Sequence, residues 1–167
     1  PVTSDTMKYA LPLLFALSPV ATLANEQACQ PIDEAQVAAL FDRWNADVQT
    51  GDPQRVVENY ARDSMLLPTV SNTPRQTPEA KLDYFQHFLA LKPKGEIVSR
   101  MVMIDCNSAL DTGLYSFHFA DGATVPARYT FTYKWFADAG QWLITSHHSS
   151  AMPEQTDVAQ QVPQADH

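Results

Sequence analysis

The chain of 167 residues has few basic residues, with 11 lysines and arginines against 19 aspartates and glutamates. The formal net charge is −8 and no basic stripe is present to displace counterions, so we expect no nucleic-acid partner. A glycine-rich phosphate loop is also missing. No carboxylate stands at ligand spacing from the histidines, and we therefore expect neither a metal ion nor a cofactor.

The chain also lacks an apolar run long enough to cross a bilayer as a mature helix. The apolar run from Tyr9 to Ala21 follows Lys8 and precedes a small-residue cleavage site at Ala24, the order typical of a secretory signal peptide. We expect residues 1–6 to be upstream residues and residues 7–24 to be the signal peptide. The mature protein is then soluble, periplasmic or secreted, and has no membrane partner. A buried N-terminal helix is the alternative.

Only two cysteines are present, and both belong to the mature part of the chain. Cys29 precedes the first predicted helix, and Cys106 ends a predicted strand. In an exported protein we expect them to form a disulfide that ties the N-terminal segment to the sheet. Such a bond would stabilise the fold by about 3–5 kcal/mol. Two unrelated thiols are the alternative.

Residues 25–152 read as one α+β domain, with helices first and antiparallel strands after them. Residues 153–167 lack periodicity and are predicted to be a disordered tail. The second helix is expected to be short and to turn Val56, Val57 and Tyr60 inward. Apolar periodicity and capping residues predict helices over 33–49, from 53 and from 77, and strands over 64–67, 97–105, 110–119 and, as a hairpin, within 125–153.

The alternation of apolar and polar residues is clearest in the final hairpin. On its first strand, apolar and polar side chains alternate, which predicts one buried face formed by Ala127, Tyr129, Phe131 and Tyr133. On its second strand, Trp142 and Ile144 share a face. A regular strand would place His148 on that same face and His147 on the opposite one. The two histidines therefore cannot bind one metal ion together.

Three segments of the domain form a recognisable ordered set. They are W-N-A-D-V-Q-T-G-D-P at 44–53, N-Y-A-R-D-S-M-L-L-P-T at 59–69 and G-Q-W-L-I-T-S-H-H-S-S-A-M-P at 140–153. Together they resemble the nuclear transport factor 2-like superfamily. Within it, they are most similar to the association domain of calcium/calmodulin-dependent protein kinase II and its free-standing bacterial relatives. The resemblance covers about Pro31 to Pro153.

This resemblance implies an α+β fold in which a curved antiparallel sheet wraps over helices as a cone, also called a cystatin-like roll. We expect a hollow beneath the helix that carries Trp44, with an open end that holds a small ligand. The resemblance further implies a homodimer or higher oligomer formed through the outer face of the sheet. Nothing in the chain looks like a kinase domain, so kinase activity is not implied.

The kinase hub binds small carboxylates through arginines, and this feature carries over only in part. The arginine that follows the histidine matching His148 is replaced here by Ser149. Arg128 and Arg100 are the remaining cationic candidates, and a place at the dimer interface is the alternative for Arg128. Other candidate lining residues, each with core packing or a structural role as the alternative, are Trp44, Tyr60, Tyr84, Tyr115, Tyr129 and His148. Asp105 and Asp111 flank a turn and are expected to be solvated.

Three hypotheses about function follow. The first is an exported, non-catalytic homo-oligomer that binds a small, carboxylate-bearing molecule in its cone. The second is an enzyme of the polyketide cyclase or isomerase kind that uses His148 and a tyrosine as its acid–base pair. The ketosteroid isomerase mechanism itself is excluded, because Pro68 and Trp44 stand where that enzyme has its general base and its oxyanion-binding tyrosine. The third is a pure assembly module whose cone is filled by side chains.

Overall fold

The computed structural model describes residues 28–154. The predicted signal peptide and nearly all of the predicted tail lie outside the described residues. Within them the chain forms α1 (Glu34–Thr50), α2 (Pro53–Val57), β1 (Tyr60–Leu67), α3 (Pro78–Leu89), β2 (Lys94–Asp105), β3 (Ser108–His118), β4 (Thr124–Phe136) and β5 (Gln141–Ala151). In this part of the chain no helix is both long and apolar enough to span a membrane.

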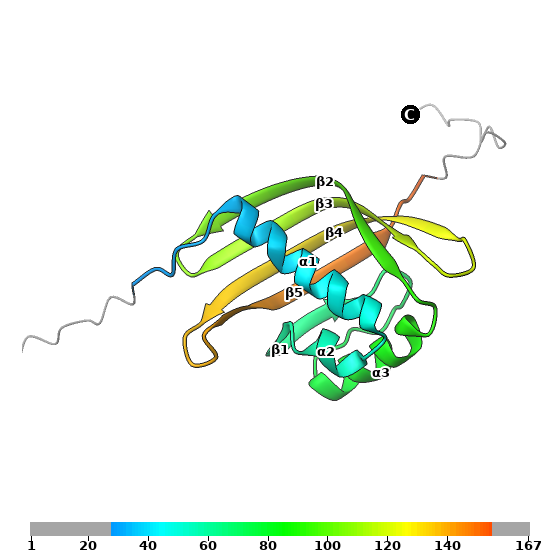
Figure 1. Cartoon of the computed structure of the whole chain (residues 1–167), viewed down its shortest axis with the longest axis horizontal. Helices are drawn as coiled ribbons and strands as arrows, with labels where there is room; N and C mark the ends of the chain where they lie inside the picture. The colour runs from blue at the N-terminus through cyan, green and yellow to red at the C-terminus, as the bar shows by residue number, and fades with distance from the viewer. Residues whose placement is uncertain (1–27, 155–167) are drawn as a thin grey trace, which may run out of the picture.

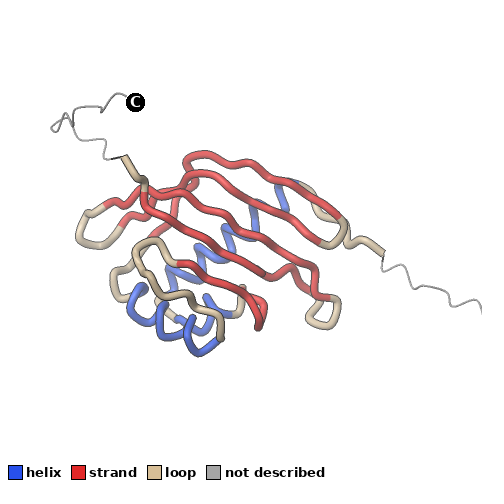
Figure 2. Tube along the Cα trace, turned by 180° about the vertical axis from the view of Figure 1, so that it is seen from behind, coloured by secondary structure: helices blue, strands red, loops and turns tan. Residues whose placement is uncertain are grey.

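The strands form one five-stranded sheet in the order β1-β5-β4-β3-β2. Strands β2 to β5 pair antiparallel with their sequence neighbours, and β1 joins the edge in parallel with β5. The sheet is curved, and α1 lies across its concave face with α2 and α3 near the β1 end (Figure 1). Seen from behind, the other face of the sheet carries no helix (Figure 2). The predicted cone-shaped α+β fold is confirmed.

The local sequence accounts for the ends of α1. Asp33 caps the helix in a capping box with Gln36, and Gly51 ends it in the left-handed conformation at φ 75°. The buried stripe consists of Val37, Phe41, Trp44 and Val48 at helical spacing, and Leu40 beside it is only partly buried. One assignment is wrong: Tyr60 is buried, but it begins β1 instead of lying on the short second helix.

Aromatic side chains fill most of the space between α1 and the sheet. Trp44 lies 5.7 Å from Phe131 and 6.2 Å from Phe117 between ring centroids, and Phe41 lies 6.1 Å from Phe131. Tyr115 and Tyr129 pack beside them at 4.8 Å. The hollow that the sequence predicts beneath α1 is therefore largely occupied by the core.

A β-bulge in β5 reverses the predicted faces of the two histidines. Ile144 pairs with Tyr133, but Ser146 pairs with the preceding residue of β4, so Thr145 is an extra residue. Beyond this point the inward-facing positions change from even to odd numbers. His147 is 3% exposed and faces the core, while His148 is exposed on the outer face. The prediction that His148 shares the face of Trp142 and Ile144 is wrong for this reason.

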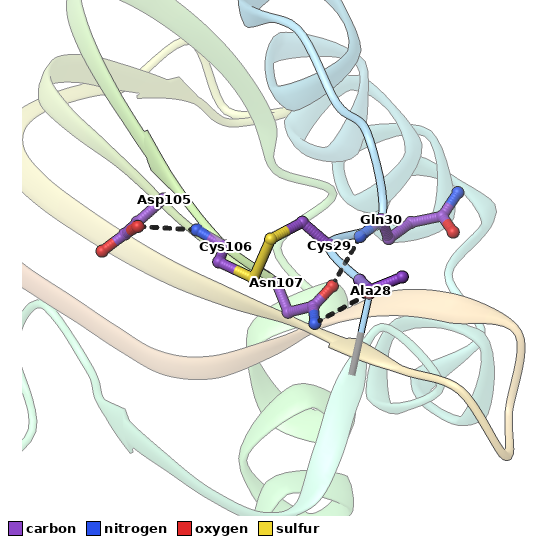
Figure 3. The surroundings of a disulfide bond; sticks show 6 residues. All are labelled: Ala28, Cys29, Gln30, Asp105, Cys106 and Asn107. Atoms are coloured by element: carbon purple, nitrogen blue, oxygen red, sulfur yellow. Dashed lines mark hydrogen bonds between the residues drawn. A yellow bond between two sulfur atoms is a disulfide. The ribbon is translucent and has the colours of Figure 1, made fainter. Parts of the chain in front are cut away.

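The predicted disulfide is present between Cys29 and Cys106, with Cα atoms 4.9 Å apart. It joins the segment before α1 to the turn between β2 and β3 (Figure 3). Asn107 supports the same junction, because its side-chain oxygen accepts a hydrogen bond of 2.7 Å from the backbone N–H of Gln30. The N-terminal end of α1 is thus fixed covalently to the end of the β2–β3 hairpin.

Candidate functional site

A small pocket lies where α1, α3 and the segment after β1 meet the sheet. The centre of a water-sized sphere can occupy about 10 Å³ in it, and the empty space between its wall atoms, open solvent included, is about 250 Å³. The pocket is thus at the threshold for holding one water molecule. Aromatic side chains form most of the wall, among them Phe85, Phe88 and Phe117.

The polar side chains of this pocket are most frequent where β1 and β5 run next to each other. Thr69, His147 and Ser149 lie there, while Tyr115 comes from β3 and Tyr84 from α3. Thr69 follows the end of β1, whereas His147 and Ser149 face inward only because the bulge at Thr145 has changed the faces of β5. The pocket therefore has an apolar, aromatic side and a side rich in hydroxyl groups.

Hydrogen bonds connect these groups into one chain. The Trp44 Nε1–H donates to the Tyr60 hydroxyl at 3.1 Å, and that hydroxyl lies 2.9 Å from Nδ1 of His147. Nε2 of His147 lies 3.3 Å from the Tyr115 hydroxyl, which donates to Ser149 Oγ at 2.5 Å. Ser149 Oγ in turn lies 2.5 Å from Thr69 Oγ1. The chain runs without a break from the core at α1 to the pocket.

The titratable side chains in and beside this series of hydrogen bonds are held in their neutral forms. Burial, and to a smaller extent the nearby His148, lowers the pKa of His147 to about 3. Burial raises the pKa of Tyr115 and raises that of Tyr60 well above its ordinary value. At the mouth, burial raises the pKa of Tyr84 to about 12. Near neutral pH the site therefore offers neutral hydroxyl and imidazole groups and no fixed charge.

Arg100 does not serve as a free cationic anchor, because it is paired inside the cone. Its Nε lies 3.0 and 3.1 Å from the two carboxylate oxygens of Asp111, and the Tyr129 hydroxyl donates to the same carboxylate at 2.8 Å. Asp111 is fully buried, so the expectation that it is solvated is wrong. The strand β3 begins at Ser108, and its alternation turns Asp111 inward.

Arg128 and His148 lie on the outer face of the sheet, away from the pocket. Nε of Arg128 donates to Ser150 Oγ at 3.1 Å. Both residues line a shallow hollow of about 400 Å³ together with threonine and serine hydroxyls. The structure thus separates the candidates predicted from the sequence. Trp44, Tyr84 and Tyr115 line the pocket, and Tyr60 lies behind it in contact with Trp44 and His147. Arg100, Arg128 and His148 are not part of the lining.

Three polar residues of the pocket were not predicted as site residues from the sequence, namely Thr69, His147 and Ser149. If the alternation of a regular strand is counted from Trp142, His147 and Ser149 both fall on the outer face. No feature of the sequence indicates the bulge that reverses this. In residues 28–154 no group of three or more His, Cys, Asp or Glu side chains is arranged to hold a metal ion.

Comparisons with known proteins agree with this architecture. The family model described as "Calcium/calmodulin dependent protein kinase II association domain" matches residues 33–153. A solved structure of a putative domain of this kind from Xanthomonas campestris is 49% identical, with a TM-score of 0.69, and the match covers 77% of this chain and 94% of that chain. No match was found among curated protein sequences.

Two more distant structures share the fold. An NTF2-like protein of unknown function from Pseudomonas putida is 20% identical, with a TM-score of 0.63, and the match covers 74% of this chain and 89% of that chain. The iota-carbonic anhydrase from a cyanobacterium, solved in complex with bicarbonate, is 20% identical, with a TM-score of 0.66 and coverage of 74% and 94%. The chain belongs to the family of the calcium/calmodulin-dependent protein kinase II association domain, with the NTF2-like fold.

Proposed function

We propose that the pocket binds bicarbonate and carbon dioxide and that the chain interconverts them. The observation that carries this proposal is the pairing of a very small pocket volume with a wall divided into an aromatic and a hydroxyl-rich side. A carbon dioxide molecule is apolar and suits the aromatic side, whereas the oxygen atoms of bicarbonate suit the hydroxyl groups. The bicarbonate complex of the iota-carbonic anhydrase, which has the same fold, supports this choice of ligand.

The size of the pocket argues against the larger ligands of related folds. A pocket in which the centre of a water-sized sphere can occupy only about 10 Å³ has no room for a steroid or a polyketide. Bicarbonate has one carbon and three oxygen atoms and needs more room than one water molecule. Thr69 and Tyr84 are partly exposed lining residues, and binding of bicarbonate requires these side chains to move outward.

The hydration of carbon dioxide needs few side chains. In the hydration direction, a water oxygen forms a bond to the carbon of carbon dioxide, and one C=O π pair moves onto an oxygen atom. The water gives up one proton to solvent or buffer at the open mouth, and the product is bicarbonate. The free O–H of the hydrogen-bonded pair Ser149 and Thr69 stabilises the oxygen that gains negative charge, and removing one such donor lowers the rate of related reactions by about 10²–10³-fold.

The test is stopped-flow measurement of carbon dioxide hydration with the disulfide-bonded protein. We expect activity in the wild type and a loss of about 100-fold in Ser149→Ala. Ser150→Ala is the matched control, because the same side chain is removed from the same strand on the opposite face. A wild-type rate equal to that of buffer would contradict catalysis. Bicarbonate binding without catalysis would instead support the non-catalytic hypothesis.

We also propose that the protein is a homodimer or higher oligomer that associates through the outer face of the sheet. The family to which the chain belongs supports association, and no helix covers this face in Figure 2. Met101 and Met103 are 55% and 57% exposed on β2, at positions that alternate with the inward-facing Arg100. Light scattering should give a multiple of the monomer mass, and Met103→Glu should lower it. A monomeric wild type would contradict the proposal.

Export to the periplasm or beyond is the third part of the proposal. A disulfide between exposed cysteines is compatible with an oxidising compartment. Cell fractionation followed by N-terminal sequencing should find the protein outside the cytoplasm with Asn25 as its first residue. A cytoplasmic protein that keeps residues 7–24 would contradict export.

A further inference from the structure

In the hydrogen-bond chain behind the pocket, Trp44 determines which group donates and which accepts in each bond. An indole Nε1–H can only donate, so the Tyr60 hydroxyl accepts from it at 3.1 Å. The second contact of this hydroxyl is Nδ1 of His147, at 2.9 Å. Tyr60 is only 6% exposed, and no other acceptor for its proton is present among residues 28–154. The Tyr60 proton therefore points to Nδ1 of His147.

This contact determines the tautomer of His147. A ring nitrogen that accepts a hydrogen bond carries no proton, so neutral His147 has its proton on Nε2. The opposite tautomer would leave the Tyr60 proton buried without an acceptor. That loss disfavours the opposite tautomer by a factor of roughly 5 to 150.

The same order of donor and acceptor continues from His147 to the side chains that line the pocket. The Nε2–H of His147 faces the Tyr115 oxygen at 3.3 Å, and the Tyr115 proton is given to Ser149 Oγ. Ser149 and Thr69 together have two hydroxyl protons, and the hydrogen bond that joins them uses one. The other has no acceptor among the described residues and remains available at the pocket.

We infer that this series of hydrogen bonds presents an O–H donor to the pocket, so that the ligand of the pocket is a hydrogen-bond acceptor such as an oxyanion. Tyr60 is the positioning residue that sets this polarity, meaning the direction in which every group of the series donates. The inference deepens the proposed function and rests on it only for the choice of bicarbonate as the oxyanion. The polarity itself depends on the two fixed donors, Trp44 and Tyr60. A cationic or purely donating ligand would leave this proton without an acceptor and is disfavoured by it.

The first experiment determines the tautomer of His147 by ¹⁵N NMR of histidine-labelled protein, independently of any ligand. Wild type is expected to show a protonated Nε2 and an unprotonated Nδ1. Tyr60→Phe removes the donor to Nδ1, and we expect the population of the Nδ1–H tautomer to rise at least 5-fold. Tyr133→Phe is the matched control, because Tyr133 is also buried and its hydroxyl has no hydrogen-bond partner among the described residues. A wild type protonated on Nδ1, or a tautomer ratio unchanged in Tyr60→Phe, overturns the inference.

The second experiment follows the His147 ring signals during titration with bicarbonate, formate and methylammonium. Shifts with the two anions and none with methylammonium are expected, and a response to methylammonium alone overturns the polarity. If formate binds and bicarbonate does not, the proposed substrate is wrong while the inferred polarity stands. If the tautomer is as inferred and no anion binds, both the ligand class and the proposed function are wrong. Should Tyr60→Phe not fold, Trp44→Phe serves as the second variant, because it removes the first donor of the chain.

Discussion

Acid should destabilise this protein through His147, and the effect can be separated from that of other groups. Burial lowers the pKa of His147 to about 3 in the folded state, whereas an unfolded histidine has a pKa of about 6.5. A depressed pKa means that the unfolded state binds the proton more readily. The stabilisation is therefore complete above pH 6.5 and is lost as the pH falls toward 3.

The size of the effect follows from the two pKa values. Between pH 7.5 and pH 4.5 the free energy of unfolding should fall by roughly 3 kcal/mol through this one group. Urea unfolding at both pH values, followed by tryptophan fluorescence, measures the fall. His147→Gln should be less stable at pH 7.5, because it loses the stacking on Phe131 at 3.9 Å, but it should lose about 3 kcal/mol less on acidification.

His148→Gln is the matched control, since His148 is the neighbouring residue and is exposed on the outer face. Because the nearby His148 makes only the smaller contribution to the lowered pKa of His147, this variant should keep most of the wild-type loss of free energy between the two pH values. If wild type and His147→Gln lose the same free energy between the two pH values, the imidazole is not buried in its neutral form. The tautomer argument for the pocket would then lose its basis.

Three further predictions concern stability. Reducing the single disulfide, which spans 77 residues, should lower the free energy of unfolding by about 4–5 kcal/mol, as measured by urea unfolding with and without reductant; equal midpoints would contradict this. Asp111→Asn should cost about 3 kcal/mol because it leaves the partly buried guanidinium of Arg100 without its carboxylate, whereas Asp105→Asn at an exposed position should cost far less. Gly113→Ala should lower the thermal midpoint strongly, because the added Cβ would lie within 2.8 Å of backbone atoms of Ser99; an unchanged midpoint would show that the strand shifts freely.

Much of the fold could be predicted because local signals and tertiary packing agree. A helix start near Asp33 and the glycine after the helix delimit α1, the alternation identifies β4, and the structure contains both elements. The position of Cys29 before α1 and of Cys106 after β2 was enough to predict the disulfide.

The pocket could be predicted only in part. Trp44, Tyr60 and Tyr115 were candidates because aromatic residues on inward faces must lie near the cone. The roles of His147 and Ser149 depend on the one extra residue at Thr145, and a bulge of this kind is decided by pairing with the neighbouring strand. The chemistry-bearing residues of β5 were therefore assigned to the wrong face.

Arg128 and Arg100 show a second limit of the sequence. Each was a candidate because a guanidinium binds carboxylates well. Arg128 lies on a strand position that alternates outward, and the carboxylate that occupies Arg100 belongs to Asp111, a partner on the neighbouring strand. Sequence spacing does not show which side chain of a neighbouring strand lies opposite a given residue, so the internal ion pair could not be foreseen.

The central claim is that the pocket interconverts carbon dioxide and bicarbonate, and ¹³C exchange NMR at chemical equilibrium tests it most directly. The account predicts an exchange rate between the two carbon signals that rises in proportion to the concentration of disulfide-bonded wild-type protein and falls about 100-fold in Ser149→Ala. An exchange rate that stays at the value of buffer alone at every protein concentration would contradict it.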